Sequence, residues 1–331
     1  MEKLLDVRAL SVTFATYDGL LKVLDNVNLA VQEQEKVGLV GEAGCGKTTT
    51  MKCIARVLPI PPADIPSGEI LIRGENILKA NLRKVHGSSR YGASMIFQDP
   101  TAALNPVFTV GHQLADALKS DHTSQRLGRS ALRQRAIEAL HAAALPDPER
   151  IMRNYPVQLS GGMRQRVCIA LALATARELL IADEPGTSLD VTIRDQILRL
   201  LNQLVSERKL SVILISHALG AVKNLADRVN VMYAGTIVES ARTPDFFSQP
   251  RHPYAEALLR TVPRLTGGGI APGIPGRIPD YLTPPSGCRF HPRCPYVMEI
   301  CSQERPEFYD LGGGRSVACF LYRNGVEKRE A

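Results

Sequence analysis

The chain has 331 residues, 44% of them hydrophobic, so it can bury a large core and form one large domain with a smaller one, or two domains. No apolar run approaches the roughly 18 residues of a membrane span, and acidic residues interrupt the N-terminal stretch before a signal-peptide core forms, so we expect a cytosolic protein. The net charge of +7 suits a nucleotide, a nucleic acid or an anionic membrane surface without choosing among them.

Short apolar runs, taken in chain order, predict an α/β protein. Antiparallel strands are expected first, a buried parallel strand next, and further strands after a proline-rich break at residues 59–66. The predicted strands cover residues 4–14, 23–32, 37–40, 69–73, 91–97, 178–182, 210–215 and 229–233. Helical periodicity runs almost unbroken through residues 110–176, which predicts a helical insertion between two halves of the core.

A glycine-rich loop connects the predicted strand at 37–40 to a helix-compatible stretch at 49–58. Its pattern G-x-x-x-x-G-K-[ST] is that of a phosphate-binding loop, in which glycines let backbone N–H groups turn toward an anion at a helix N-terminus. Lys47 is expected to reach the β/γ-phosphates, and the Thr48 hydroxyl to ligate Mg²⁺. The alternative, a plain turn before a helix, does not explain the Lys-Thr pair. The predicted ATP-binding residues are Gly41, Glu42, Ala43, Gly44, Cys45, Gly46, Lys47, Thr48 and Thr49.

Two carboxylates end the apolar run at residues 179–182. A buried strand that delivers acids to the carboxyl edge of a sheet has this pattern. We expect Asp183 to hold Mg²⁺ and Glu184, which points differently because strand residues alternate, to act as general base. A strand followed by an ordinary acidic turn is the alternative, and the preceding phosphate-binding loop argues against it.

A second anion-binding turn, Leu-Ser-Gly-Gly at residues 159–162, begins another apolar helix. The ordered set of phosphate loop, Gln98, Leu-Ser-Gly-Gly, Asp-Glu, Ser188-Leu-Asp190 and His217 resembles the ATP-binding cassette (ABC) ATPases over residues 1–240. The resemblance implies a mixed sheet with the phosphate loop, an antiparallel β subdomain and a helical subdomain at about 99–176. It also implies two cassettes stacked head to tail. The residues expected to contact ATP bound by the partner are Leu159, Ser160, Gly161, Gly162 and Gln165.

The same resemblance assigns further roles. Gln98 would sense the γ-phosphate and ligate Mg²⁺, Asp190 would pass information across the dimer, and His217 would hold the γ-phosphate and the attacking water. By itself His217 could merely end a strand. Tyr17 is the expected adenine-stacking aromatic and Phe14 the second candidate, although either fits ordinary packing.

Cys45 stands where the family usually has serine. Beside Lys47 and a helix N-terminus, its thiol is expected to have a depressed pKa and to react with alkylating reagents unless ATP protects it.

The predicted C-terminal region covers residues 241–331. From Thr243 its composition becomes rich in proline and glycine, and Cys288, Cys294, Cys301 and Cys319 follow. This part resembles the C-terminal extension of oligopeptide, dipeptide and nickel importers, so a small irregular Cys-rich domain is expected after the cassette at 1–240. Cytosolic thiols stay reduced, which favours a Cys₄ metal site over disulfides. The resemblance implies a [4Fe-4S] cluster; Zn²⁺ and four unligated thiols are the alternatives. We expect the metal site to stabilise the folded extension, which is too poor in apolar residues to fold unaided; a regulatory domain is the alternative.

Together these features predict an ATPase subunit of an importer for peptides, with nickel, opine or glutathione as alternative cargo. The expected partners are a second cassette, in a heterodimer or alternatively a homodimer, two transmembrane permease subunits that dock near residues 98–110, and an extracytoplasmic solute-binding protein. The protein would lie peripherally on the cytoplasmic face of the cell membrane. A soluble ABC protein acting on nucleic acid or ribosomes, and an exporter cassette, are the rivals. The single cassette, the lack of sustained heptads and the cysteine-bearing tail argue against both, and no nucleic-acid partner is expected.

Overall fold

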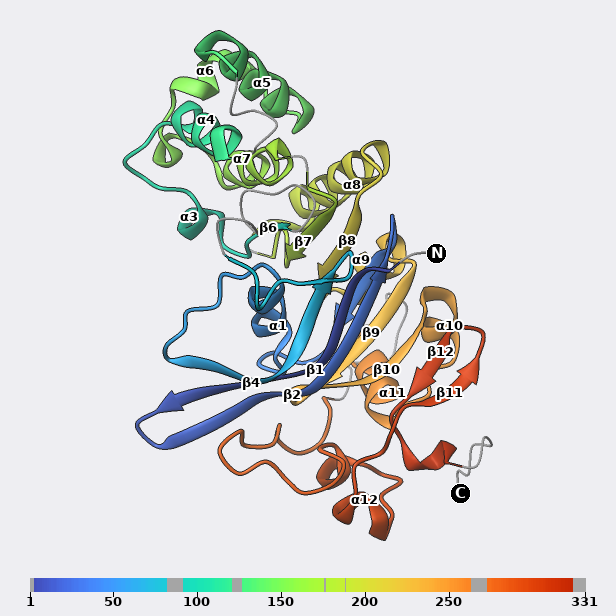
Figure 1. The fold of residues 1–331 in the computed structure, drawn as a ribbon. Helices are drawn as coiled ribbons and strands as arrows, with labels where there is room; N and C mark the ends of the chain where they lie inside the picture. The colour runs from blue at the N-terminus through green and yellow to red at the C-terminus, as the bar shows by residue number, and fades with distance from the viewer. Residues whose placement is uncertain are drawn as a thin grey trace.

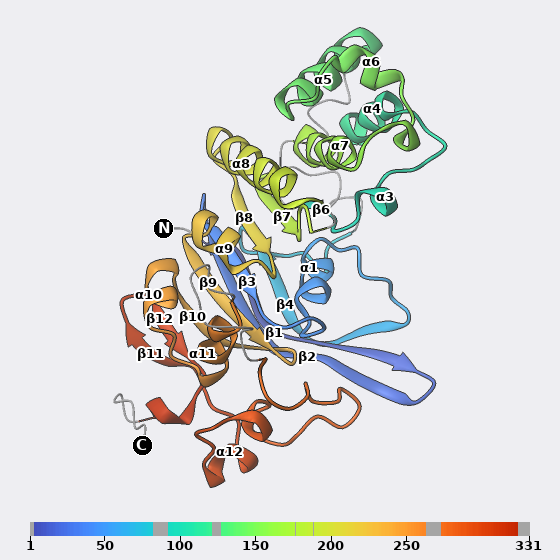
Figure 2. The same ribbon diagram turned by 180° about the vertical axis from the view of Figure 1, so that it is seen from behind.

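The computed structural model describes residues 3–81, 92–120, 127–175, 177–187, 189–262 and 273–323. These residues form two β-sheets, a helical region and a C-terminal segment that runs beside the larger sheet (Figure 1). The helical region (green) lies at one end of the molecule and the C-terminal segment (orange to red) at the other, in both Figure 1 and the reverse view of Figure 2.

The smaller sheet is antiparallel throughout and has the strand order β2-β1-β4-β5. Its strands are β1 (Lys3–Thr16), β2 (Gly19–Gln32), β4 (Ala63–Ile72) and β5 (Glu75–Asn76). The first two predicted strands are confirmed, although both are longer than expected. The predicted break at 59–66 extends too far, because β4 begins at Ala63 and includes Pro66. Proline is tolerated there because β5 pairs only with Leu71 and Ile72, which leaves Pro66 on an open edge.

The larger sheet has the order β11-β12-β10-β9-β3-β8-β7-β6 and is mixed. Parallel pairing joins β9, β3, β8, β7 and β6, whereas β10, β11 and β12 pair antiparallel. The strands are β3 (Lys36–Val40), β6 (Ala93–Ile96), β7 (Leu179–Asp183), β8 (Ser211–Ile215), β9 (Arg228–Tyr233), β10 (Thr236–Arg242), β11 (Tyr309–Gly312) and β12 (Arg315–Val317). The parallel strands confirm the predicted α/β core, and Tyr91, the first residue of one predicted strand, lies outside the described residues.

The central strands carry apolar residues on both faces because the sheet is covered on both sides. On β7, Leu179 and Ile181 contribute to a core shared with the smaller sheet and α1 (Lys47–Ile54). Leu180 and Ala182 contribute to a second core that includes residues of α8 and α9. Helix α1 therefore lies between the two sheets, in the position that a phosphate-binding loop needs for its helix.

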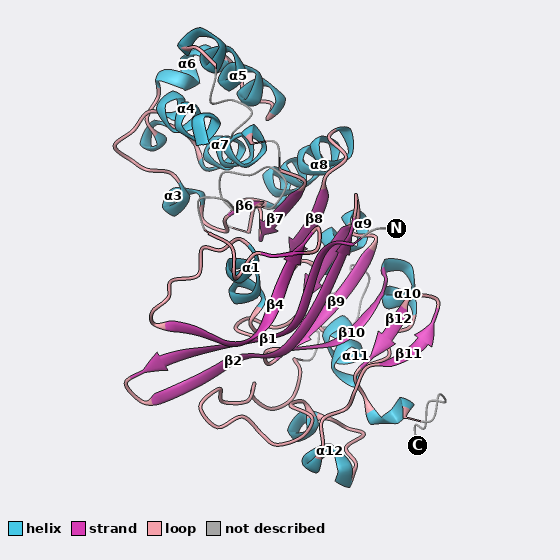
Figure 3. Cartoon of the chain, in the orientation of Figure 1, coloured by secondary structure: helices cyan, strands magenta, loops and turns pink. Residues whose placement is uncertain are grey.

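The predicted helical insertion is confirmed for the residues described, and Figure 3 shows its helices grouped apart from the sheets. Its helices are α3 (Pro100–Ala103), α4 (Val110–Ser120), α5 (Arg129–Ala142), α6 (Pro148–Arg153), the 3₁₀ turn η1 (Pro156–Gln158) and α7 (Gly161–Ala174). The helices after it are α8 (Val191–Glu207), α9 (Leu219–Leu225), α10 (Thr243–Ser248) and α11 (Pro253–Arg260). No helix within the described ranges is long and apolar enough to cross a membrane.

The C-terminal segment continues the larger sheet. Strand β10 crosses the predicted boundary at residue 240, and the hairpin β11–β12 pairs with β10 on its outer side. The irregular character that was expected is found between residues 273 and 308, where the elements are η2 (His291–Arg293) and α12 (Glu299–Gln303); a last 3₁₀ turn, η3, covers Phe320–Tyr322. An independent Cys-rich domain is therefore not supported, since part of this segment is built into the cassette's sheet.

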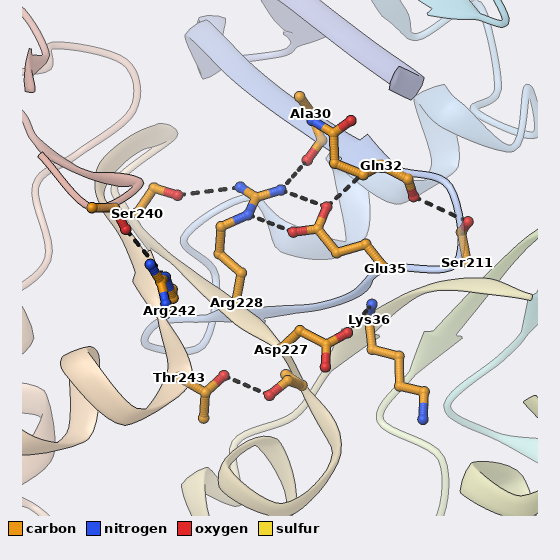
Figure 4. Close-up of polar contacts among 12 residues, drawn as sticks. Ala30, Gln32, Glu35, Lys36, Ser211, Asp227, Arg228, Ser240, Arg242 and Thr243 are labelled. Carbon is orange, nitrogen blue, oxygen red and sulfur yellow. Dashed lines mark hydrogen bonds and ion pairs between the residues drawn. The ribbon is translucent and has the colours of Figure 1, made fainter. Parts of the chain in front are cut away.

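A polar network ties the two sheets together at the amino ends of the parallel strands (Figure 4). Arg228, the first residue of β9, donates to both carboxylate oxygens of Glu35 at 2.7 and 2.9 Å and to the Ala30 carbonyl at 2.7 Å. Asp227 accepts from the Lys36 backbone N–H at 2.8 Å. These contacts join β2 of the smaller sheet to β3 and β9 of the larger one, at the edge opposite the carboxyl ends of the parallel strands.

Candidate nucleotide site

The loop of residues 41–46 passes so close to its neighbours that two of its glycines have no room for a side chain. A Cβ on Gly41, where φ is +154°, would lie 2.1 Å from the Met232 carbonyl oxygen. A Cβ on Gly46, where φ is +107°, would lie 2.6 Å from the Leu24 Cδ2. Helix α1 follows directly, with no side-chain cap at its N-terminus, so its first N–H groups remain for an external acceptor.

Two backbone carbonyls of the loop hold the Lys47 ammonium. Its Nζ donates to the Gly41 and Glu42 oxygens at 2.8 and 2.9 Å, and the side chain is nearly inaccessible to solvent. The Cys45 sulfur lies 3.6 Å from the same Nζ. Cys45 is 1% exposed, and its burial raises the thiol pKa more than Lys47 lowers it. The predicted depressed pKa of Cys45 is therefore wrong, because desolvation of the thiolate outweighs the nearby cation.

Asp183 ends β7 beside α1. The Thr48 hydroxyl donates a hydrogen bond to its carboxyl group, and burial, followed by the Glu184 charge, raises the pKa of Asp183. The Asp183 Oδ1 atom is buried without a hydrogen-bond partner among the described residues. An unpartnered carboxylate oxygen beside a threonine hydroxyl is a donor set that fits Mg²⁺, which prefers hard oxygen ligands.

Glu184 lies between the side chains of Gln98 and His217. The Glu184 Oε1 is 2.5 Å from His217 Nε2, and its Oε2 accepts from Gln98 Nε2 at 3.1 Å. Glu184 has φ +48°, an uncommon conformation for a residue with a side chain, and its backbone N–H donates to the Ile215 carbonyl at 3.0 Å. Glu184 thus contacts both of the other residues predicted to be catalytic, although Gln98 precedes it by 86 positions in the chain.

A cavity of about 430 Å³ joins this group to the phosphate loop. Gly41 and Glu42 line one side of it, and Ser216 and His217 line another. The cavity thus brings the start of the loop and the end of β8 to one place at the carboxyl edge of the sheet, where α/β proteins bind their ligands.

The predicted signature residues form the start of α7, in the helical region. Ser160 is the N-cap, and its hydroxyl accepts from the Met163 N–H at 3.3 Å. Leu159 is in the core of the helical region, and Gly161 and Gly162 form the first turn. Gln165 differs from the expectation, because its side chain is fully buried and both polar atoms lack a partner among the described residues. Contact with a nucleotide on another cassette would require this side chain to turn outward.

The remaining predicted residues are more scattered. Tyr17 is fully exposed in the turn of the β1–β2 hairpin, so its adenine-stacking role stays a prediction. Phe14 packs against the core between the sheets, which identifies it as a packing residue. Asp190 is the N-cap residue of α8 without a side-chain cap bond, and Ser188 lies outside the described residues.

The four C-terminal cysteines converge on one cavity, whose wall also includes His252 and Phe290. Burial, with a smaller contribution from the neighbouring thiols, raises the pKa of Cys288 to about 11 and that of Cys319 to about 12. Among the described residues, no three His, Cys, Asp or Glu side chains are arranged to hold a metal ion. The predicted Zn²⁺ and [4Fe-4S] sites are thus not supported by the side-chain geometry, although the cysteines are grouped as predicted.

Three residues of the C-terminal segment contact the phosphate loop, and the sequence analysis identified none of them in this role. Arg293 forms an ion pair with Glu42, the Tyr281 hydroxyl donates to the Gly44 carbonyl, and the Tyr254 hydroxyl accepts from the Glu42 N–H. No local motif marks these residues, because each contact joins positions more than 200 residues apart.

Two family models match the chain. The ABC transporter model matches residues 24–187, and the model of the oligopeptide/dipeptide transporter C-terminal region matches residues 238–301. The second match covers Cys288, Cys294 and Cys301 and the residues that contact the phosphate loop from the C-terminal side.

Curated relatives are similar over nearly the whole chain. The probable peptide ABC transporter ATP-binding protein y4tR of Sinorhizobium fredii is 43% identical over 96% of this chain and 94% of its own length. The dipeptide transport ATP-binding protein DppD of Bacillus subtilis is 42% identical, covering 99% and 97%. The oligopeptide transport ATP-binding protein OppD of the same organism is 39% identical, covering 99% and 91%.

Solved cassettes share the fold. A dimeric structure of MJ0796, a bacterial ABC transporter cassette, superimposes with a TM-score of 0.62 at 25% identity, over 72% of this chain and 98% of that one. The cassette cbiO1 of Clostridium perfringens gives a TM-score of 0.60 at 24% identity, over 75% and 92%. Each superposition includes about three quarters of this chain.

Proposed function

Because this chain belongs to the ATP-binding proteins of ABC transporters, in the branch that carries the oligopeptide/dipeptide transporter C-terminal region, we propose that its ATP hydrolysis drives import of peptides. The relatives described above are named as peptide, dipeptide and oligopeptide transport proteins, which supports a peptide cargo. Nickel, opine and glutathione are the alternative cargo, with the same mechanism.

The contact of Glu184 with Gln98 and His217 beside the phosphate loop carries this proposal. In the mechanism we propose, the γ-phosphate of ATP replaces the loop carbonyls as acceptor for Lys47. A water aligned by His217 then attacks the γ-phosphorus, Glu184 accepts its proton, and the bond to ADP breaks. Phosphoryl transfer needs this combination of charge neutralisation, in-line water and base, with little covalent chemistry.

Thr48, Asp183 and Gln98 would hold Mg²⁺, as the unpartnered Asp183 oxygen supports. When bound, the ion neutralises charge on the β- and γ-phosphates. The other loop residues, from Gly41 to Thr49, would hold the phosphates through backbone N–H groups, and Tyr17 would stack on the adenine.

We also propose that the functional unit contains two cassettes. Lys47 and Ser160 belong to separate parts of the chain, the first between the sheets and the second at the start of a helix in the helical region. A head-to-tail partner would bring a second signature turn, with Asp190 at the boundary, to each phosphate loop. A different cassette as partner is the first choice, and a second copy is the alternative.

The surface around α3 is the proposed docking site for two membrane permease subunits. Val107 is 70% exposed and Phe108 44% exposed, which is unusual for side chains that gain free energy by burial. Docking there would place this protein peripherally at the cytoplasmic face of the cell membrane. An extracytoplasmic binding protein would deliver the solute, and no nucleic-acid partner is required.

For the cysteine cavity we propose a [4Fe-4S] cluster. All four thiols line one cavity and a proline follows Cys294, which supports the proposal, but cluster binding would require the thiols to move from the arrangement described above. A cluster or a Zn²⁺ ion would replace the thiol protons that burial otherwise favours. Iron, sulfide and zinc analysis after anaerobic purification distinguishes the two, and stoichiometric zinc without iron would refute the cluster.

Replacing Glu184 by Gln tests the proposed reaction. We expect ATP turnover by the assembled transporter to fall by about 100-fold or more, because the base is lost, while ATP still binds. Phosphate release and nucleotide binding are measured side by side.

The matched control is Glu178→Gln, at the other end of the same strand, where the carboxylate pairs with Arg73 instead. Turnover that persists in Glu184→Gln, or that falls equally in the control, would contradict the assignment of Glu184 as the base.

A further inference from the structure

Arg293 uses every N–H group of its guanidinium. Its Nε donates to the Pro275 carbonyl at 2.8 Å, and its two terminal nitrogens donate to the Ile274 carbonyl at 3.1 Å and the Tyr233 hydroxyl at 3.3 Å. The same two nitrogens also donate to the two carboxylate oxygens of Glu42, at 2.9 and 3.2 Å. Five donors thus have five acceptors, with a side chain only 3% exposed. Arginine alone among the side chains offers this planar fork.

Glu42, which accepts these hydrogen bonds, is the second residue of the phosphate loop. Its backbone N–H donates to the Tyr254 hydroxyl at 2.7 Å, and its carbonyl accepts from Lys47 Nζ at 2.9 Å. One residue therefore connects the phosphate-binding lysine to two residues of the C-terminal segment. A displacement of the Glu42 side chain would displace an acceptor of Lys47.

Tyr281 holds the same loop at a second point. Its hydroxyl donates to the Gly44 carbonyl at 2.8 Å, and its own carbonyl accepts from the Lys22 N–H of β2 at 2.8 Å. The loop has glycines at three of its six positions and gains little order from its own sequence. Its order therefore depends on contacts of this kind from outside.

The cysteine cavity and the phosphate loop share an aromatic wall. Phe290 lines the cavity and packs against Tyr233 and Tyr254, with ring centroids 5.1 and 5.5 Å apart. Tyr233 and Tyr254 in turn contact Arg293 and Glu42. Arg293 also directly precedes Cys294 in the chain. Continuous packing thus runs from the thiols to the loop.

We propose that Arg293 is a positioning residue for the phosphate-binding loop and that it transmits changes at the four-cysteine cavity to nucleotide affinity. This inference rests on the proposed function, in which the loop binds ATP. Arg293 does not touch the reacting atoms. It holds Glu42, and with it the backbone of the loop, in the geometry that the phosphates require, so the loop loses less freedom when nucleotide binds.

The first experiment compares nucleotide dissociation constants of full-length Arg293→Gln, Arg293→Lys and Glu42→Gln, with Mg-ATP as the titrant. We expect each to weaken binding by about 10-fold or more, because buried charge-assisted hydrogen bonds are lost. We do not expect Arg293→Lys to restore nucleotide affinity, because lysine keeps the positive charge but lacks the planar set of N–H donors. The KM for ATP should rise while kcat at saturation changes little, because the base Glu184 is untouched.

The matched control is Arg305→Gln. Arg305 is another arginine of the same segment in an ion pair, with Asp25, but it has no contact with the phosphate loop in the described structure. Its nucleotide affinity should equal that of the wild type. Equal losses in Arg305→Gln and Arg293→Gln, or an unchanged affinity in folded Arg293→Gln, would overturn the proposal.

A double-mutant series tests transmission from the cysteines. Cys294→Ser should weaken Mg-ATP binding in the wild-type background and have no further effect in the Arg293→Gln background, because the connection is already broken. Additive losses would overturn the transmission. Lys47→Ala serves as the reference for the proposed function: if it still binds ATP normally, the loop is not the nucleotide site and that assignment fails, independently of Arg293.

Discussion

Cys45 shows how burial can reverse the effect of a neighbouring charge. The Lys47 ammonium is 3.6 Å away, yet the sulfur is removed from water, and the thiol pKa rises. A thiolate loses more hydration free energy on burial than one partly satisfied cation restores. The cysteine that replaces the usual serine is therefore a small packing residue of the loop.

Native Cys45 should consequently label slowly. At pH 7.5 a raised pKa leaves a smaller thiolate fraction than an ordinary cysteine has, and the thiolate is the nucleophile. We expect iodoacetamide labelling of Cys45, followed by peptide mass spectrometry, to be far slower in the folded protein than in guanidinium chloride. Rapid labelling of the folded protein that ATP suppresses would contradict this.

At the scale of elements, the amino ends of β3, β8 and β9 are joined by polar contacts and their carboxyl ends hold the nucleotide site. Arg228 and Glu35 are mostly buried, with side chains 19% and 14% exposed. Their ion pair (Figure 4) connects the two sheets at the amino ends of these strands, opposite the edge that carries the candidate nucleotide site. Stability and chemistry are thus concentrated at opposite ends of the same strands.

Arg228→Ala should lower the free energy of unfolding by roughly 2 kcal/mol, because it leaves the mostly buried Glu35 carboxylate without its partner. Nucleotide affinity well below the melting temperature should be unchanged. Denaturant unfolding and ATP titration measure the two effects.

Arg242→Ala is the comparison for Arg228→Ala. Arg242 lies on the neighbouring strand and, among the residues that the structure describes, its side chain donates only to the Gly313 carbonyl, so its removal should change stability little. A similar loss of stability in both variants would show that the contact with Glu35 is not the cause.

At the scale of the whole molecule, the helical region and the C-terminal segment lie at opposite ends, with the phosphate loop between the sheets (Figures 1 and 2). The C-terminal segment holds the loop from one side through Arg293 and Tyr281. The predicted stabilising role of the metal site concerns only the folding of this segment. The contacts with the loop lead us to expect that changes at the cysteines also weaken ATP binding.

Specific ATPase activity should depend on the second cassette. The turnover rate per molecule is expected to rise with protein concentration, or on addition of the cognate partner cassette, because in the proposed head-to-tail pair each site takes its signature turn from another chain. Phosphate release over a dilution series, with light scattering for the mass, measures this. Full activity of a chain that light scattering shows to be monomeric would contradict the composite site.

The sequence by itself determined the α/β core and the helical insertion, and it predicted which residues form the catalytic group. These features are local: each is set by the backbone preferences and the side-chain periodicity of roughly ten to fifteen consecutive residues. The strand patterns, the phosphate loop and the acidic end of a strand are examples. Contact of Glu184 with Gln98 and His217 followed from the parallel strands that carry them to one edge.

Three features were decided only by the tertiary structure. They are the burial of Cys45 and Gln165, the pairing of β10–β12 with the larger sheet, and the ion pair between Arg293 and Glu42. Each depends on desolvation or on pairing between segments that lie far apart in the chain. A desolvation free energy is set by everything that surrounds a group, and no local pattern of residues records it.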